Sequence, residues 1–171
     1  VDSGLTLLYV GYDKELLGVI AMRDTMRENA AQTLAKLRKL GVKELIMLTG
    51  DVQSKAGQVA SELGIDRVYA NCLPTDKAGI IEQLKAEGKK VAFVGDGIND
   101  APSLTKAHVG ISMQKGADIA KATADISLLK DDIGSVAVAK DVANKTMRLI
   151  NTNFNATVGI NSLILAGATF G

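Results

Sequence analysis

The chain has 171 residues, of which 47% are hydrophobic and 23% are charged, and its 20 basic residues nearly balance 19 acidic ones. This composition is that of a folded domain with a core, and the near-neutral charge with only 4% aromatic residues argues against nucleic acid as a partner. Cys72 is the single cysteine, which excludes an internal disulfide and favours a reducing compartment. His108 is the single histidine, so it is interpreted as a surface or structural residue.

Apolar runs that predict strands alternate along the chain with segments whose apolar residues recur at helical spacing. The expected strands are 5–10, 15–21, 44–49, 67–70, 91–94, 109–112 and 125–129. The expected helices are 26–40, 54–63, 75–87 and 131–150, and a glycine follows each of the first three. The first two strands are typical of a hairpin. The later alternation predicts an α/β fold with a doubly wound parallel sheet.

The end of the chain carries no charge after Arg148, and the residues from 149 to 171 are apolar with four asparagines among them. At about 1.5 Å per residue, a helix of this run approaches the length of a bilayer span. We therefore expect a C-terminal membrane helix. The alternative is an amphipathic helix that packs on the preceding domain.

The most specific motif is Gly-Asp-Gly-Ile-Asn-Asp-Ala-Pro at 95–102, which follows an expected strand and places Pro102 near a first helical turn. Asp96 and Asp100 crowd this turn, and clustered carboxylates need a positive partner. Oxygen ligands suit Mg²⁺, so the motif predicts a magnesium site at the sheet edge. Asn99 would be a neutral ligand or a hydrogen-bonding support.

Two further groups follow other expected strands. The hydroxyl of Thr49 and the backbone N–H of Gly50, in the sequence Thr49-Gly50-Asp51, suit a phosphoryl oxygen. Lys77 lies at the start of an expected helix, where both its ammonium and the helix dipole favour an anion. Each group is weak alone, because Thr-Gly-Asp is a common turn and a lone lysine is usually solvated. Their order, together with the acidic motif, predicts one phosphoryl-binding site.

These three motifs together resemble the phosphorylation domain of P-type cation-transporting ATPases, which belong to the haloacid dehalogenase-like superfamily. The segment from 107 to 113 is similar as well, although His108 stands where the family usually has aspartate. Glu28 likewise replaces a usual proline. The short distance from the acidic motif to the uncharged run resembles the heavy-metal-transporting group.

The resemblance implies a Rossmann-type, haloacid dehalogenase-like fold and three parts of the chain. Residues 1–21 would be the end of the nucleotide-binding domain or a return hairpin, 22–145 the phosphorylation domain, and 146–171 a truncated transmembrane helix. It also implies Mg²⁺ and ATP as cofactors. The implied partners are a transported divalent heavy-metal ion, the remaining domains of the pump and the lipid bilayer. The implied location is the cell membrane, with the phosphorylation domain in the cytoplasm.

Roles of single residues follow from the same resemblance. Thr49, Lys77 and Asp100 would be catalytic, with Gly50, Asp51 and Asn99 helping to bind the phosphoryl group and Asp96 and Asp100 holding Mg²⁺. Asn161 is the candidate ligand of the transported ion. With Ser162 beside it, the oxygen donors favour cobalt, manganese or zinc over Cu(I), which prefers thiolates.

The family nucleophile is the aspartate of Asp-Lys-Thr-Gly-Thr, which attacks the γ-phosphate of ATP to form an aspartyl-phosphate whose hydrolysis drives ion release. This chain lacks that motif, since its two Asp-Lys pairs lie at 13–14, in the hairpin, and at 76–77, in the lysine motif. We therefore expect a C-terminal piece of a pump that is inactive alone. The alternatives are a soluble haloacid dehalogenase-like phosphatase, which would also need such an aspartate, and a non-catalytic module that binds Mg²⁺ or phosphate.

Overall fold

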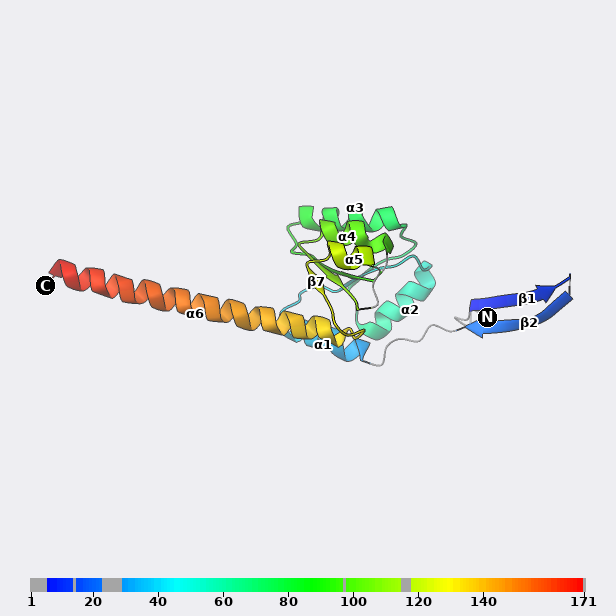
Figure 1. Ribbon diagram of the computed structural model, residues 1–171, viewed down its shortest axis with the longest axis horizontal. Coiled ribbons are helices and arrows are strands. Elements are labelled where there is room, and N and C mark those ends of the chain that lie inside the picture. Colours follow the sequence, from blue (N-terminus) through cyan, green and yellow to red (C-terminus); the bar gives the residue numbers. More distant parts are fainter. Residues whose placement is uncertain (1–5, 14, 23–28, 97, 115–117, 171) are drawn as a thin grey trace.

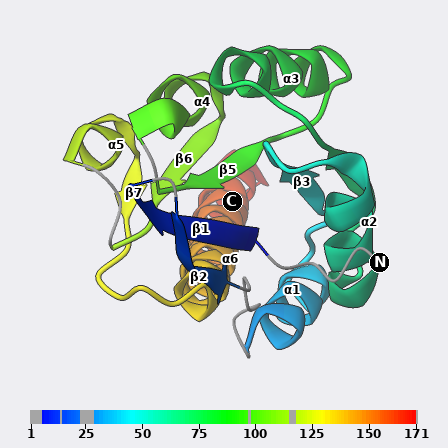
Figure 2. The ribbon, with the colours of Figure 1, turned by 90° about the vertical axis from the view of Figure 1, so that its right-hand side faces the viewer.

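The computed structural model describes residues 6–13, 15–22, 29–96, 98–114 and 118–170. Parallel strands lie between two layers of helices, with α3, α4 and α5 on one side and α1, α2 and the start of α6 on the other (Figures 1 and 2). The strands are β3 (Ile46–Leu48), β4 (Arg67–Tyr69), β5 (Ala92–Gly95), β6 (Val109–Ser112) and β7 (Ile126–Ser127). The helices are α1 (Ala30–Lys39), α2 (Gln53–Leu63), α3 (Pro74–Ala86), α4 (Ala101–Lys106), α5 (Asp118–Thr123) and α6 (Gly134–Phe170). The predicted α/β class is confirmed.

The parallel strands form two hydrogen-bonded sheets, not the single sheet that the alternation predicted. β3 pairs with β4 in one sheet, and β5, β6 and β7 pair in that order in the other. Among the residues that the structure describes, no ladder joins β3 to β5. The single-sheet prediction is thus wrong for these residues, because alternation indicates the direction of strands while their lateral order depends on distant segments.

The boundaries of several elements also differ from expectation. The helix expected over 26–40 begins at Ala30, and its earlier residues up to 28 lie outside the described part of the chain. The last strand, expected over 125–129, is reduced to Ile126–Ser127. Asp125 instead accepts a hydrogen bond at 2.7 Å from the backbone N–H of Gly110, so this carboxylate ends the strand pairing at β6.

The hydrophobic core lies between α1, β6 and the first turns of α6. It contains Leu37, Ile111, Met113, Leu128, Val136 and Ala137. On the opposite side of the strands, Ile81 of α3 and Leu104 of α4 are each 1% exposed. Burying such side chains contributes about 1.5–3 kcal/mol each, so α3 and α4 are firmly held where the acidic motif begins.

A ring of four charged side chains lies at the starts of the strands. Arg67 contacts Glu44 and Glu87, and Lys89 contacts the same two carboxylates. These contacts hold the pKa of Glu87 below its usual value, chiefly through the hydrogen bond from Arg67, and raise the pKa of Lys89 through Glu44. Because Glu44 precedes β3 and Lys89 precedes β5, the ring joins the two sheets at the end opposite the strands' carboxyl termini.

The predicted hairpin is present as β1 (Thr6–Tyr12) and β2 (Glu15–Met22), which pair antiparallel with an irregularity between Val10 and Gly11. It stands apart from the α/β body (Figure 1). Neighbouring residues of a strand point to opposite faces, and both Leu8 and Tyr9 are more than half exposed, as are Leu16 and Leu17. Both faces of the hairpin therefore present apolar side chains.

The expected helix over 131–150 is confirmed, and it continues as the single helix α6 to Phe170, over 37 residues. Asn144 of α6 donates at 2.8 Å to the backbone oxygen of Leu40, and from Lys145 the described side chains of α6 are exposed. Within the described residues, no helix is both long and apolar enough to cross a membrane. The membrane helix expected over 146–171 is thus not shown: the length is there, but the interspersed asparagines lower the apolar content.

His108 lies on the surface before β6, and its Nδ1 accepts a hydrogen bond from the backbone N–H of Val91 at 3.1 Å. This agrees with its interpretation as a surface or structural residue. Partial desolvation lowers the pKa of the His108 imidazole from 6.5, as do the charges of Lys90 and Lys85. Below pH 6.5 the unfolded chain then binds more protons than the folded one. We expect the stability linked to neutral His108 to be complete above pH 6.5 and to fall as the pH drops toward the folded pKa.

Thermal unfolding followed between about pH 5 and pH 8 tests this expectation, with His108→Asn as the comparison, because its amide oxygen can accept the same bond without titrating in this range. The melting temperature of the parent chain should decline more on acidification than that of the variant. Equal declines would contradict the assignment.

Candidate phosphate and magnesium site

The acidic motif places a buried carboxylate directly after β5. Asp100 ends a short 3₁₀ turn (Ile98–Asp100) and is 7% exposed. Its Oδ1 accepts a hydrogen bond at 2.8 Å from Nζ of Lys77, and its Oδ2 accepts the backbone N–H of Asp96 at 3.3 Å. The positive partner expected for the clustered carboxylates was Mg²⁺, and the structure adds an ion pair that was not expected, between Asp100 and Lys77 of α3.

Glycine at position 95 allows this arrangement. A Cβ added there would lie 2.8 Å from Cβ of Asp100 and 2.9 Å from Cε1 of Phe93, closer than side chains approach. The side chain of Asp100 thus occupies the space beside the end of β5 that any larger residue would take. Asp96 and Asn99 are exposed next to it. Gly97 lies outside the described residues.

Lys77 is placed by the way α3 begins. Pro74 is the first residue of this helix, a position whose backbone N–H would have no partner within the helix, so the N–H that proline lacks is not missed. The carboxylate of Asp76 accepts the backbone N–H of Leu73 at 2.8 Å, so Asp76 caps the start of the helix. The ammonium of Lys77 then reaches Asp100, and the pair is mostly buried, with 20% and 10% of the two side chains exposed.

The Thr49 turn, residues 49–51, follows the other sheet at the end of β3. The Oγ1 of Thr49 accepts the backbone N–H of Asp51 and donates to its Oδ2, both at 3.1 Å. Gly50 and Asp51 are exposed, so their backbone is open to solvent. In the part of the chain that the structure describes, no hydrogen bond or ion pair links the Thr49 turn to Lys77.

The segment between β4 and α3 does link them, and sequence reasoning missed this. The backbone N–H of Asn71 donates to the oxygen of Asp51 at 2.8 Å, and that of Cys72 donates to the oxygen of Thr49 at 2.9 Å. Asn71 has a φ of +53°, in the left-handed region that asparagine tolerates better than most residues. The sequence feature that could have indicated this conformation is an asparagine two residues after a strand. Cys72 itself is half-buried with a free thiol that contacts the oxygen of Tyr69.

The donor set of this edge fits Mg²⁺ better than a metal that needs an all-protein cage. Asp96, Asp100 and Asn99 supply two carboxylates and an amide oxygen, and Mg²⁺ is commonly held by one or two carboxylates together with waters and phosphate oxygens. The described residues contain no group of three or more histidine, cysteine or acidic side chains placed to hold a metal ion. Asn161 lies far along the exposed part of α6, which projects from the body (Figure 1).

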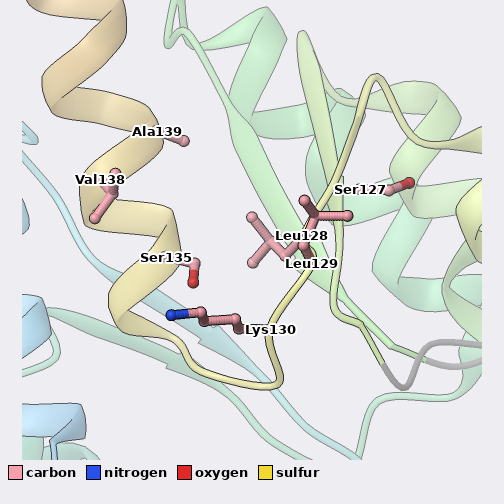
Figure 3. A pocket seen from close by; sticks show the side chains of 7 residues that line it. All are labelled: Ser127, Leu128, Leu129, Lys130, Ser135, Val138 and Ala139. Atoms are coloured by element: carbon pink, nitrogen blue, oxygen red, sulfur yellow. The ribbon is translucent and has the colours of Figure 1, made fainter.

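An open hollow of about 400 Å³ lies elsewhere, between the segment after β7 and the start of α6 (Figure 3). Its walls are formed by Ser127, Leu128, Leu129, Lys130, Ser135, Val138 and Ala139. None of the predicted site residues lines it, and its single charged residue is Lys130. The hollow is therefore separate from the carboxylate and lysine chemistry.

Comparison with known proteins agrees with this geometry. A family model described as haloacid dehalogenase-like hydrolase matches residues 2–108, and a second model of that description matches residues 78–139. The chain belongs to the haloacid dehalogenase-like hydrolases.

Its relatives within that family are heavy-metal P-type ATPases. The chain is 40% identical over 165 residues, 96% of its length, to a probable cadmium-transporting ATPase of Staphylococcus aureus. It is 40% identical over 169 residues, 99% of its length, to a copper-exporting P-type ATPase of Bacillus subtilis strain 168. A crystal structure of a zinc-transporting PIB-type ATPase in its E2.Pi state superposes with a TM-score of 0.81 at 37% identity, over 95% of this chain and 26% of that one.

The chain spans about a fifth of the length of the curated relatives it matches, 20% and 21% for these two. It is homologous to their haloacid dehalogenase-like phosphorylation domain, so the predicted resemblance is confirmed.

Proposed function

We propose that this chain is the phosphoryl-binding part of an ATP-driven heavy-metal cation pump that works through an aspartyl-phosphate intermediate. The observation that carries the proposal is the 2.8 Å bond between Nζ of Lys77 and Oδ1 of Asp100, which brings together two motifs from different elements. A lysine paired with a buried carboxylate at the carboxyl edge of parallel strands is suited to holding a phosphoryl group next to a divalent cation.

In this proposal Lys77 neutralises charge on the phosphoryl oxygens, because its ammonium has two donors left after the bond to Asp100. The hydroxyl of Thr49 and the N–H of Gly50 orient the phosphoryl group. A phosphoryl oxygen would then accept the hydrogen bond that the Thr49 hydroxyl now donates to the Asp51 carboxylate. Asp96 and Asp100 hold Mg²⁺ and Asn99 supports them. Bound Mg²⁺ would supply further neutralisation of the phosphoryl charge.

The proposal includes a location for the missing nucleophile. The starts of β3 and β5 are close, since Lys89 and Glu44 form an ion pair, yet each strand pairs on one side only among the described residues. A strand edge without a ladder presents backbone groups with which a further strand can pair. A strand ending in Asp-Lys-Thr-Gly-Thr, inserted there, would carry its aspartate to the edge between Thr49 and Asp96.

The remaining parts of the pump are proposed on the same basis. Residues 1–21 would be the end of the nucleotide-binding domain or a return hairpin, whose exposed apolar side chains are suited to contact another part of the pump, and residues 22–145 would form the phosphorylation domain. ATP, the other pump domains and a cell membrane are the proposed partners. The cargo is a divalent heavy-metal ion, in line with relatives named for cadmium, copper and zinc. Asn161 is its proposed ligand.

Phosphoenzyme formation tests the proposal. The chain alone, incubated with γ-labelled ATP and Mg²⁺, should acquire no acid-stable, hydroxylamine-labile label, because it lacks the nucleophile. The same chain expressed as a continuous polypeptide with an upstream segment holding Asp-Lys-Thr-Gly-Thr should become labelled. A version of that polypeptide with the motif's aspartate changed to asparagine serves as the control.

Each outcome discriminates. Label on the chain alone would contradict the assignment of the missing aspartate. If the extended polypeptide binds phosphate and Mg²⁺ but neither labels nor hydrolyses ATP, the chain is a non-catalytic binding module instead.

A further inference from the structure

Asn71 occupies a junction between the two halves of the candidate site. It follows β4 and precedes the start of α3, and the N–H groups of Asn71 and Cys72 both donate to the Thr49 turn, at 2.8 and 2.9 Å. A regular parallel ladder would send the N–H of residue 71 to the oxygen of Thr49, after the bond from Thr49 N–H to the oxygen of Tyr69 at 2.9 Å. Instead the N–H of Asn71 donates to the oxygen of Asp51, and the N–H of Cys72 donates to the oxygen of Thr49.

The backbone of Asn71 makes this change possible. Its φ is +53°, and only one other described residue that is not glycine, Asp13, has a positive φ. A left-handed residue turns its own N–H and the next one toward the same side, so two donors can reach one turn. The side chain of Asn71 is exposed. What the position requires is therefore a residue that accepts the left-handed conformation.

The chain continues from this junction directly into the lysine motif. Leu73, two residues on, is bound by the carboxylate of Asp76 at 2.8 Å, and Lys77 lies in the same first turn of α3 and reaches Asp100 at 2.8 Å. Bonded contacts thus run from the Thr49 turn through residues 71 to 73 to Lys77 and Asp100.

We propose that Asn71 is a positioning residue that sets the Thr49 turn against Lys77 through its left-handed backbone. The inference rests on the proposed phosphoryl-binding function of those two groups. Because Thr49 and Lys77 lie on separate elements without a direct bond, the backbone conformation at residue 71 determines how well both can contact one phosphate. The effect of a substitution at residue 71 on phosphate binding should follow the energetic cost of a positive φ for the new residue. It should not follow the loss of the asparagine side-chain amide.

A graded series at this position tests the proposal on the full 171-residue chain. Asn71→Gly accepts a positive φ, Asn71→Ala accepts it poorly and Asn71→Val, which is β-branched, accepts it worst. Asp13→Val places the same strain at the hairpin turn, which is remote from the site, and is the matched control. If Asn71→Val does not fold, the glycine and alanine variants decide.

Two measurements are made on each variant. The first is amide hydrogen exchange of Cys72 without ligand, which reports whether the bond to Thr49 is kept. The second is the dissociation constant for inorganic phosphate with Mg²⁺ present, followed by the amide resonances of Thr49 and Lys77. We expect Asn71→Val to speed exchange and weaken phosphate binding roughly tenfold, Asn71→Ala to lie between, and Asn71→Gly and Asp13→Val to stay within about threefold of the parent.

Unchanged exchange and binding in Asn71→Val would overturn the proposal. So would an effect of Asn71→Gly as large as that of valine, because the amide side chain would then be responsible. Failure of the parent chain to bind phosphate would contradict the proposed function instead, and the ligand-free exchange of Cys72 would still decide the role of Asn71.

Discussion

Replacing Lys77 by methionine should weaken the binding of inorganic phosphate in the presence of Mg²⁺ by at least about tenfold, since a unit charge some 4 Å away contributes several kcal/mol at the effective dielectric of a partly buried site. The change has a second consequence. Asp100 is 7% exposed and loses the ammonium bonded to its Oδ1, so its negative charge opposes the incoming anion more strongly. Isothermal titration calorimetry or the amide resonance of Thr49 measures the affinity.

Lys85→Met is the matched control for this experiment. Lys85 lies on the same helix, and its ammonium donates at 2.8 Å to the backbone oxygen of Lys106, away from the acidic motif. It should alter phosphate affinity by no more than about twofold, the size of a screened surface effect. Equal losses in both variants would mean that overall charge, and not the position of Lys77, governs binding.

Gly110→Ala should be the most destabilising small substitution in the body of the protein. A Cβ there would lie 2.6 Å from the backbone oxygen of Leu104, and 3.0 Å from its carbonyl carbon. Backbone atoms cannot rotate away, so α4 must move off β6. We expect a loss of about 3 kcal/mol in the free energy of unfolding, at the upper end for overpacking. That loss lowers the melting temperature by about 6–12 °C.

Denaturant and thermal unfolding measure this effect, and Gly57→Ala is its control. Nothing lies within 4 Å of a Cβ at Gly57, which is inside α2, so alanine should stabilise the chain there by about 0.5–1 kcal/mol. The Gly110 variant should also bind phosphate less well, because α4 begins immediately after Asp100. A Gly110→Ala protein as stable as the parent would show that α4 has room to shift.

Much of this structure was predictable because it depends on local patterns. Asp96, Asp100, Lys77 and Thr49 each follow or begin a recognisable element, and the carboxyl ends of parallel strands lie at one edge of a sheet. The contact between Lys77 and Asp100 was not predicted, since the positive partner expected for the carboxylates was Mg²⁺. Asp76 caps α3 from the first turn of that helix.

Other features depend on contacts between distant segments, and single-sequence reasoning missed them. The separation of β3 and β5 into two sheets is set by which strands are available to pair. The left-handed conformation of Asn71 could hardly be predicted from the sequence, because an asparagine before a helix is common and does not by itself indicate a positive φ. For the membrane helix expected over 146–171, the finding is that no described helix is both long and apolar enough to cross a membrane, and four asparagines interrupt the uncharged run.

By itself, the sequence determined the α/β class, the order of its elements, the motifs and the absence of a nucleophilic Asp-Lys-Thr-Gly-Thr, because each of these is written in neighbouring residues. Only the tertiary structure decided that Lys77 pairs with Asp100, that residues 71 and 72 hold the Thr49 turn, and that no ladder joins β3 to β5 among the described residues. Those features arise from residues far apart in the chain, whose distances are set by the packing of helices on strands.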